Sequence, residues 1–300
     1  MVSLFLGQAK KGGNEVASML WKELKLKGLQ AGSLCKELNF VFDNCAGQNK
    51  NRMVLRFIVV LAKLKFAKIV RAIFLVKGHT KNDCDRMFNL MKFDYRKENI
   101  YTPTELIALV NKHKQVNAIA MEASDFLDWS ALEDRMMADK VTQVKKNHIF
   151  YVTQDDTNVL HKQECDGEPS VPQTIVLPQF QDPAYDWQGE VNKLQVLAEP
   201  GLQDIKWNEL YRKWGAFIPE DKKAGFKYYM QGPPRDVLED VKKQAQQARK
   251  QRAKRSRSTA SNAAVGSPAK KSAPETQKNV SAPLLYCYCY CGACWQYCML

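Results

Sequence analysis

Two acidic side chains, Asp43 and Asp85, each follow an apolar segment that is typical of a buried strand. Asp43 ends the segment Leu38–Asp43 and opens a polar loop, while Asp85 comes shortly after the β-branched segment Ile69–Val76. Carboxylates at the carboxyl ends of neighbouring parallel strands lie at one edge of an α/β sheet, and this is the edge at which such folds have their active and ligand-binding sites. Two carboxylates placed there could share one hydrated divalent cation.

Further polar side chains of the two loops are expected to line the same edge. The loop after the first strand runs Asp43-Asn44-Cys45-Ala46-Gly47-Gln48-Asn49-Lys50-Asn51, and the second contains Gly78-His79-Thr80. The predicted lining residues are Asn44, Gln48, Asn49, His79 and Asp83.

Each of these residues also has a simpler interpretation. An aspartate that ends a strand is common in turns, and Asp83 or Asp85 alike would be favoured in the first turn of a helix. Gln48 and Asn49 are typical of residues that cap a helix, and His79 is typical of a hydrogen-bonded turn residue.

The two motifs resemble the catalytic core of the RNase H-like superfamily, which includes DDE/D transposases and retroviral-type integrases. More narrowly, they are similar to those of a family of transposon-derived proteins found in several eukaryotic lineages. The resemblance makes Leu38–Asp43 the fourth strand of that fold and Ile69–Val76 the fifth. It also makes Asp43 the second acid and Asp85 the third, the latter preferred over Asp83 because Asp85-Arg86-x-Phe88 matches the family pattern.

The first strand of the superfamily and its aspartate have no counterpart in this chain, because the residues before Asn14 are too few for a three-stranded meander. In such enzymes two Mg²⁺ ions, about 3.5–4 Å apart, clamp the attacking and leaving oxygens of a phosphodiester. Two carboxylates, those of Asp43 and Asp85, are too few to hold two Mg²⁺ ions well. The resemblance therefore implies a truncated transposase-like protein, descended from a Mg²⁺-dependent DNA-cleaving and strand-joining enzyme and inactive in this form. A non-enzymatic nuclear protein that binds nucleic acid and a decayed reading frame are the alternatives.

The charge distribution favours DNA as a partner. Residues 1–100 carry 19 basic and 8 acidic side chains, a net charge of +11, residues 101–240 a net charge of −8, and residues 241–300 a net charge of +10. Basic side chains that neutralise phosphates release counterions, so binding is electrostatic and non-specific. The predicted phosphate contacts beside the acidic edge are Lys50, Arg52, Lys77, Lys81 and Arg86.

The basic run near the C-terminus is typical of a nuclear-localisation signal or a nucleic-acid-binding patch. It comprises Arg249, Lys250, Arg252, Lys254, Arg255 and Arg257. A membrane span is not expected, because the longest apolar run, Met53–Ala62, is half the length needed and contains Arg56.

Composition and periodicity predict an α/β protein with four parts. By the resemblance, residues 1–117 form a partial RNase H-like core, a parallel strand pair with flanking helices. Residues 118–232 are an α+β accessory region. Residues 233–283 are a disordered basic tail, and residues 284–300 a Cys/Tyr-rich terminus without structure. Five of the nine cysteines lie in that terminus, where a soft-metal site is the alternative.

Two charged patterns are expected to face solvent. Arg52, Arg56 and Lys63 recur at helical spacing and predict one polar stripe on an otherwise buried helix. The acidic residues around Trp129 predict an amphipathic, solvated face; they are Glu122, Asp125, Asp128, Glu133 and Asp134.

Overall fold

The computed structural model describes residues 2–4, 12–76, 91–94, 96–113, 117–202, 204–224, 230–233, 239, 243, 285–291 and 294–299. Met1–Gly201 and Pro283–Leu300 form one compact unit, and Leu202–Ala282 forms a second. The sequence predicted boundaries after residues 117, 232 and 283. None of the helices within the described residues is long and apolar enough to cross a membrane.

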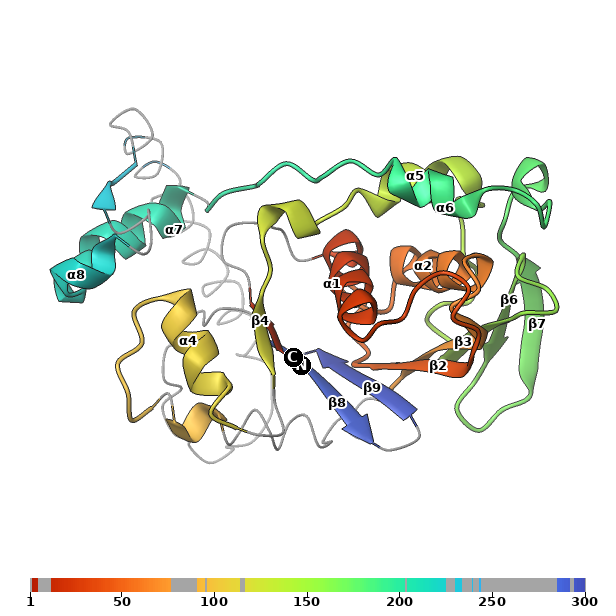
Figure 1. Ribbon diagram of the computed structural model, residues 1–300, viewed down its shortest axis with the longest axis horizontal. Helices are drawn as coiled ribbons and strands as arrows, with labels where there is room; N and C mark the ends of the chain where they lie inside the picture. Colours follow the sequence, from red (N-terminus) through yellow and green to blue (C-terminus); the bar gives the residue numbers. More distant parts are fainter. Residues whose placement is uncertain are drawn as a thin grey trace, which may run out of the picture. The chain divides into compact units, whose positions relative to one another are not determined.

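The first unit is an α/β fold around a five-stranded mixed sheet in the order β2-β3-β5-β6-β7 (Figure 1). Its first two strands are adjacent and parallel, from Cys35↔Ala67 to Phe42↔Phe74, as the sequence predicted. The later strands are antiparallel to their neighbours. The bounds are β2 Cys35–Phe42, β3 Ala67–Phe74, β5 Ile149–Thr153, β6 Val159–Gln163 and β7 Pro169–Thr174.

Residues 118–201, which belong to the predicted accessory region, share the core with the parallel strand pair. The reason is the pairing of β5 with β3, which runs from Ile69↔Thr153 to Ile73↔Ile149 and continues the sheet. Val70 and Ala72 of β3 are fully buried beside Phe150 and Val152 of β5. The predicted strand pair is therefore one part of a larger sheet.

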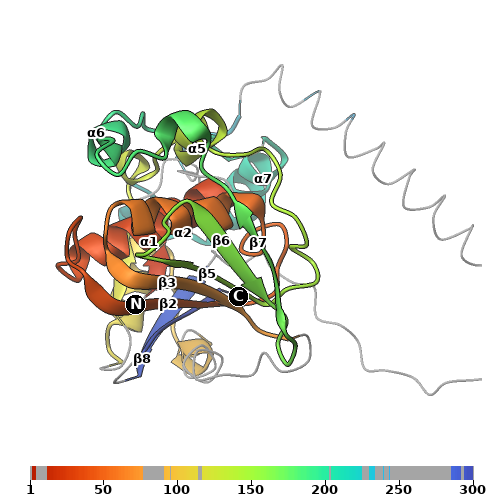
Figure 2. The same ribbon diagram turned by 90° about the vertical axis from the view of Figure 1, so that its right-hand side faces the viewer.

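Helices α1 (Gly13–Leu26) and α2 (Arg52–Lys63) cover one face of this sheet, and α5 (Trp129–Met136) and α6 (Trp187–Asn192) lie over them (Figures 1 and 2). Trp129 of α5 is fully buried, with its ring centroid 5.3 Å from that of Trp21 on α1 and 4.8 Å from that of Phe57 on α2. Its indole nitrogen donates a hydrogen bond to Ser18 Oγ. Aromatic packing therefore fixes α5 on α1 and α2.

The structure describes further elements in both units. A second sheet has the order β4-β1-β8-β9, in which β1 is parallel to β4 and antiparallel to β8. The bounds are β1 Val2–Leu4, α4 Pro103–Val110, β4 Ala118–Ala120, η1 Ala123–Asp125, η2 Pro178–Phe180, α7 Asp204–Glu209, η3 Leu210–Trp214, η4 Gly215–Phe217, α8 Glu220–Lys223, β8 Leu285–Cys291 and β9 Cys294–Met299.

The Cys/Tyr-rich terminus, which the sequence predicted to lack structure, contains β8 and β9, which pair with each other from Tyr286↔Met299 to Cys291↔Cys294. The alternation of Tyr and Cys in residues 286–291 has the two-residue period of a strand. Of the predicted disordered tail, residues 233, 239 and 243 are described. The rest, including the basic run from Arg249 to Arg257, lies outside the described residues.

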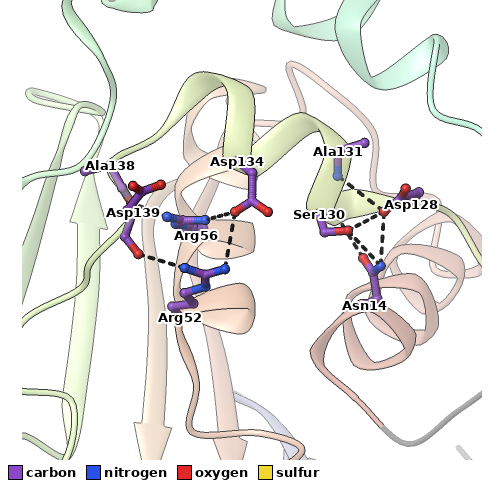
Figure 3. A network of polar contacts seen from close by, with 9 residues as sticks. All are labelled: Asn14, Arg52, Arg56, Asp128, Ser130, Ala131, Asp134, Ala138 and Asp139. Carbon is purple, nitrogen blue, oxygen red and sulfur yellow. Dashed lines mark hydrogen bonds and ion pairs between the residues drawn. The ribbon is translucent and has the colours of Figure 1, made fainter.

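The expected polar stripe on α2 is wrong at its centre. The Arg56 side chain is 0% exposed, and its guanidinium binds Asp134 Oδ1 of α5 at 2.7 Å and the carbonyl oxygen of Ala138 (Figure 3). Arg52, one turn earlier, lies 3.6 Å from the same Asp134 oxygen and donates to the Asp139 carbonyl oxygen at 3.0 Å. Two arginines of α2 therefore bind α5 and the segment that follows it.

The expected solvated acidic face is also wrong at Glu133, which is fully buried on α5. Neither carboxylate oxygen of Glu133 has a hydrogen-bond partner. Burial raises the pKa of this carboxyl well above its ordinary value, and the nearby Arg56 charge only partly offsets that effect. By contrast, Asp128 begins the helix and accepts hydrogen bonds from Asn14 and Ala131 (Figure 3).

Removing the Asp134 carboxylate should destabilise the fold, because Arg56 would keep a buried charge without its anion. We expect Asp134→Ala to lower the free energy of unfolding by about 3 kcal/mol in urea denaturation. Arg52→Ala is the matched control, since Arg52 is half exposed and contacts the same carboxylate. Arg52→Ala should lower the free energy of unfolding by less than about 1 kcal/mol. Equal decreases in the two variants would contradict the role given to Arg56.

The raised pKa of Glu133 should make stability fall as the pH rises. The folded protein keeps a proton that the unfolded chain releases, so this contribution is complete below the unfolded pKa and is lost as the pH rises through the folded pKa. Between these values the wild type should lose up to about 1.4 kcal/mol for each pH unit. Glu133→Gln should lack this loss, so its stability relative to the wild type should rise as the pH increases above the ordinary pKa of a glutamate. Parallel stability curves for the two proteins would show that Glu133 ionises normally.

Candidate functional site

The carboxyl ends of β2 and β3 form the edge of the sheet at which the sequence predicted the acidic and polar site residues. Asp43 follows β2 directly and is half-buried. The pairing continues one residue past β3, since the Leu75 amide donates to the Phe42 carbonyl oxygen at 2.9 Å. The parallel strands therefore place Asp43 at this edge, as expected from the sequence.

The loop after Asp43 is organised around one carbonyl group. The Cys45 carbonyl oxygen accepts hydrogen bonds from the amides of Gln48, Asn49 and Lys50 at 3.3, 2.8 and 2.9 Å. Asn51 then caps α2, since its Oδ1 accepts a hydrogen bond from the Val54 amide at 3.1 Å while its Nδ2 donates to the Gln48 carbonyl oxygen. The loop therefore turns sharply and leads directly into the helix.

Two neighbouring side chains of this loop, Asn49 and Lys50, are buried. Asn49 is 0% exposed, and neither its Nδ2 nor its Oδ1 has a hydrogen-bond partner. An unpaired buried amide costs about 1–3 kcal/mol. Lys50 is 5% exposed, and burial lowers the pKa of its ammonium group.

A histidine from a distant part of the sequence lies near Lys50. The Lys50 Nζ is 5.6 Å from the ring centroid of Phe74, and the Phe74 amide donates to the His148 carbonyl oxygen at 2.7 Å. The His148 Nδ1 is buried without a hydrogen-bond partner. Burial lowers the pKa of His148 and the Lys50 charge lowers it further, whereas Glu164 acts in the opposite direction. The imidazole is therefore neutral at neutral pH.

The described part of the predicted site contains Asp43, Asn44, Gln48, Asn49, Lys50 and Arg52. Asn44 and Gln48 are half-buried in the loop. The Arg52 guanidinium points to Asp134 and the Asp139 carbonyl, so it is already bound within the protein. The other predicted site residues lie outside the described residues; they are Asp85, His79, Asp83, Lys77, Lys81, Arg86, Arg249, Lys250, Arg252, Lys254, Arg255 and Arg257.

Sequence reasoning did not identify His148 as a site residue. It precedes β5, which reaches this edge only because it pairs antiparallel with β3, and the amino end of β5 then lies beside the carboxyl end of β3. No local motif marks this arrangement. The alternation of buried and partly exposed side chains in Ile149–Thr153 is a signal that could indicate the strand, but it does not indicate which strand lies beside it.

The described residues offer one predicted metal ligand, the Asp43 carboxylate. Within this part of the chain, no group of three or more His, Cys, Asp or Glu side chains is arranged to hold a metal ion. Hard carboxylate oxygens are suitable ligands for Mg²⁺, so Asp43 could hold one hydrated ion together with further oxygen ligands.

Residues 1–166, more than half of the chain, match the family model described as a domain of unknown function (DUF7869). A search of curated proteins and a search of solved structures gave no match. The matched range includes α1, α2, the four strands β2, β3, β5 and β6, and all the described residues of the site.

Loss of the Asn51 cap should loosen the junction between the loop and α2. We expect Asn51→Ala to lower the free energy of unfolding by about 1 kcal/mol, because the Val54 amide loses its acceptor. Gln48→Ala is the control, since the loop uses the backbone of Gln48 and no hydrogen bond made by its side chain is seen in the described residues. Chemical denaturation of both variants gives the comparison, and an unchanged Asn51→Ala midpoint would contradict the capping role.

Proposed function

This chain belongs to the DUF7869 family, and we propose that it is a transposase-like protein that binds DNA without cutting it. In this proposal residues 38–76 correspond to the strand–helix–strand unit of an RNase H-like transposase core. The observation that carries the proposal is the arrangement of β2, α2 and β3. The two strands are adjacent and parallel, the helix connects them, and Asp43 stands where β2 ends.

The charge of the N-terminal segment supports a polyanionic partner. Residues 1–100 have a net charge of +11, and residues 241–300 add +10. Lysines and arginines bound to phosphates give an affinity that falls with salt and depends little on base sequence. The basic run at residues 249–257 would also direct the protein to the nucleus.

The proposed lack of cleavage follows from the number of acidic ligands. Residues that match the superfamily motifs supply two acids, Asp43 and Asp85, whereas a two-metal phosphodiester displacement needs more fixed oxygens. Mg²⁺ bound there would polarise a phosphate oxygen as a Lewis acid. Asp43 would bind that ion weakly, since Mg²⁺ keeps several of its waters.

The proposal is tested by measuring DNA binding and cleavage with the full chain. Binding to an arbitrary duplex should weaken steeply as salt increases, and deletion of Lys242–Lys271 should reduce both the affinity and the salt dependence. No nicking or strand transfer should occur with Mg²⁺. The same measurement on Asp43→Ala serves as the control, because binding through basic side chains should survive it.

Two results would contradict the proposal. One is binding that does not respond to salt. The other is Mg²⁺-dependent cleavage that Asp43→Ala abolishes, which would mean that a further acid such as Glu122 or Asp125 completes the metal site.

A further inference from the structure

Lys50 differs from the other buried cations in the described residues. Arg56 has Asp134 as its anion, and Lys162 donates a hydrogen bond to Thr142 Oγ1 at 2.9 Å. Within the same part of the chain, Lys50 has a ring contact with Phe74 but neither a carboxylate nor a hydrogen-bond acceptor. A ring face offsets only part of the desolvation of an ammonium group. Within the described residues, the buried Lys50 side chain therefore has no anionic partner.

Asn49 and His148 add unpaired polar atoms to the same edge. Both amide atoms of Asn49 and the Nδ1 of His148 are buried without partners, although buried polar groups are nearly always hydrogen-bonded. These unpaired polar atoms of two residues, beside the Lys50 ammonium, point to a site for a ligand that forms hydrogen bonds.

The ligand that fits these groups is an anion. Lys50 and the Asn49 Nδ2 are donors, and the first turn of α2 contains no acidic residue that would oppose an anion at its positive end. A tetrahedral oxyanion offers several acceptor oxygens and a charge opposite to that of the ammonium group.

We infer that Lys50 and Asn49, with His148 beside them, bind a single phosphate group at the carboxyl edge of β2 and β3. The Lys50 ammonium supplies the countercharge, and the Asn49 amide supplies a hydrogen bond. This inference deepens the proposed function and depends on it for the source of the phosphate, which is the backbone of a polynucleotide. The phosphate site itself can be tested without DNA.

The test uses the full chain in chloride buffer at constant ionic strength, with inorganic phosphate as the probe. Scanning calorimetry should show a saturable rise of the wild-type Tm with phosphate, because a ligand of the folded state stabilises it by mass action. Lys50→Met should weaken the apparent phosphate affinity at least tenfold, and Asn49→Ala should weaken it several-fold. Lys68→Met, which removes an exposed lysine of β3, should respond like the wild type.

The Tm values of Lys50→Met and the wild type without phosphate distinguish a phosphate-binding role of Lys50 from a purely structural one. If the function of the Lys50 ammonium is to bind an anion, Lys50→Met should have a Tm at least as high as that of the wild type without phosphate. The substitution removes a buried charge that has no anionic partner among the described residues. A lower Tm for Lys50→Met in chloride alone would overturn the inference, as would an equal phosphate response in Lys50→Met and the wild type.

Dimethyl phosphate, a phosphodiester monoanion, separates the two sources of the phosphate. If it raises the Tm as inorganic phosphate does, the site accepts a backbone phosphodiester. If only inorganic phosphate binds, the site stands and its link to nucleic acid is wrong. If neither anion binds while DNA still does, the inference fails and the proposed function survives.

Discussion

The fold depends on the burial of one charged side chain, Arg56, in the middle of α2. A guanidinium that is 0% exposed needs its anion and its hydrogen bonds, and these come from Asp134 and the Ala138 carbonyl. Both partners belong to α5 and the segment after it. The pair therefore fixes residues 129–139 on the strand–helix–strand unit with directional contacts that apolar packing alone does not provide.

Because α2 is anchored in this way, its N-terminus also fixes the position of the loop at the candidate site. The N-terminus of α2 is capped by Asn51, whose side chain also holds the Gln48 carbonyl, and Arg52 is bound to α5 and the Asp139 carbonyl. The loop from Asp43 to Asn51 is thus held between a sheet edge and an anchored helix. A loop held in this way presents Lys50 and Asn49 in a fixed arrangement, and preorganised donors lose little entropy when a ligand binds.

Much of the N-terminal fold was predictable because local signals and the overall fold agree there. The β-branched run before Val76 and the apolar period of Met53–Ala62 indicated a strand and a helix, and their connection required a parallel crossover. The burial of Arg56 and Glu133 was not predictable, because helical spacing fits a solvated stripe as well as a helix-to-helix contact. His148 was missed for a related reason, since β5 reaches the site through pairing between distant segments. Asp85, the other predicted acid, lies outside the described residues, so its position stays a prediction.

The central claim is that the carboxyl edge of β2 and β3 meets nucleic acid through Lys50 and Asn49. The most direct measurement is a backbone NMR titration of the full chain with a short DNA duplex. The account predicts chemical-shift changes at the amides of residues 43–51 and at His148, in addition to those of the basic C-terminal run. Changes confined to residues 242–271, with the loop after Asp43 unaffected, would contradict it.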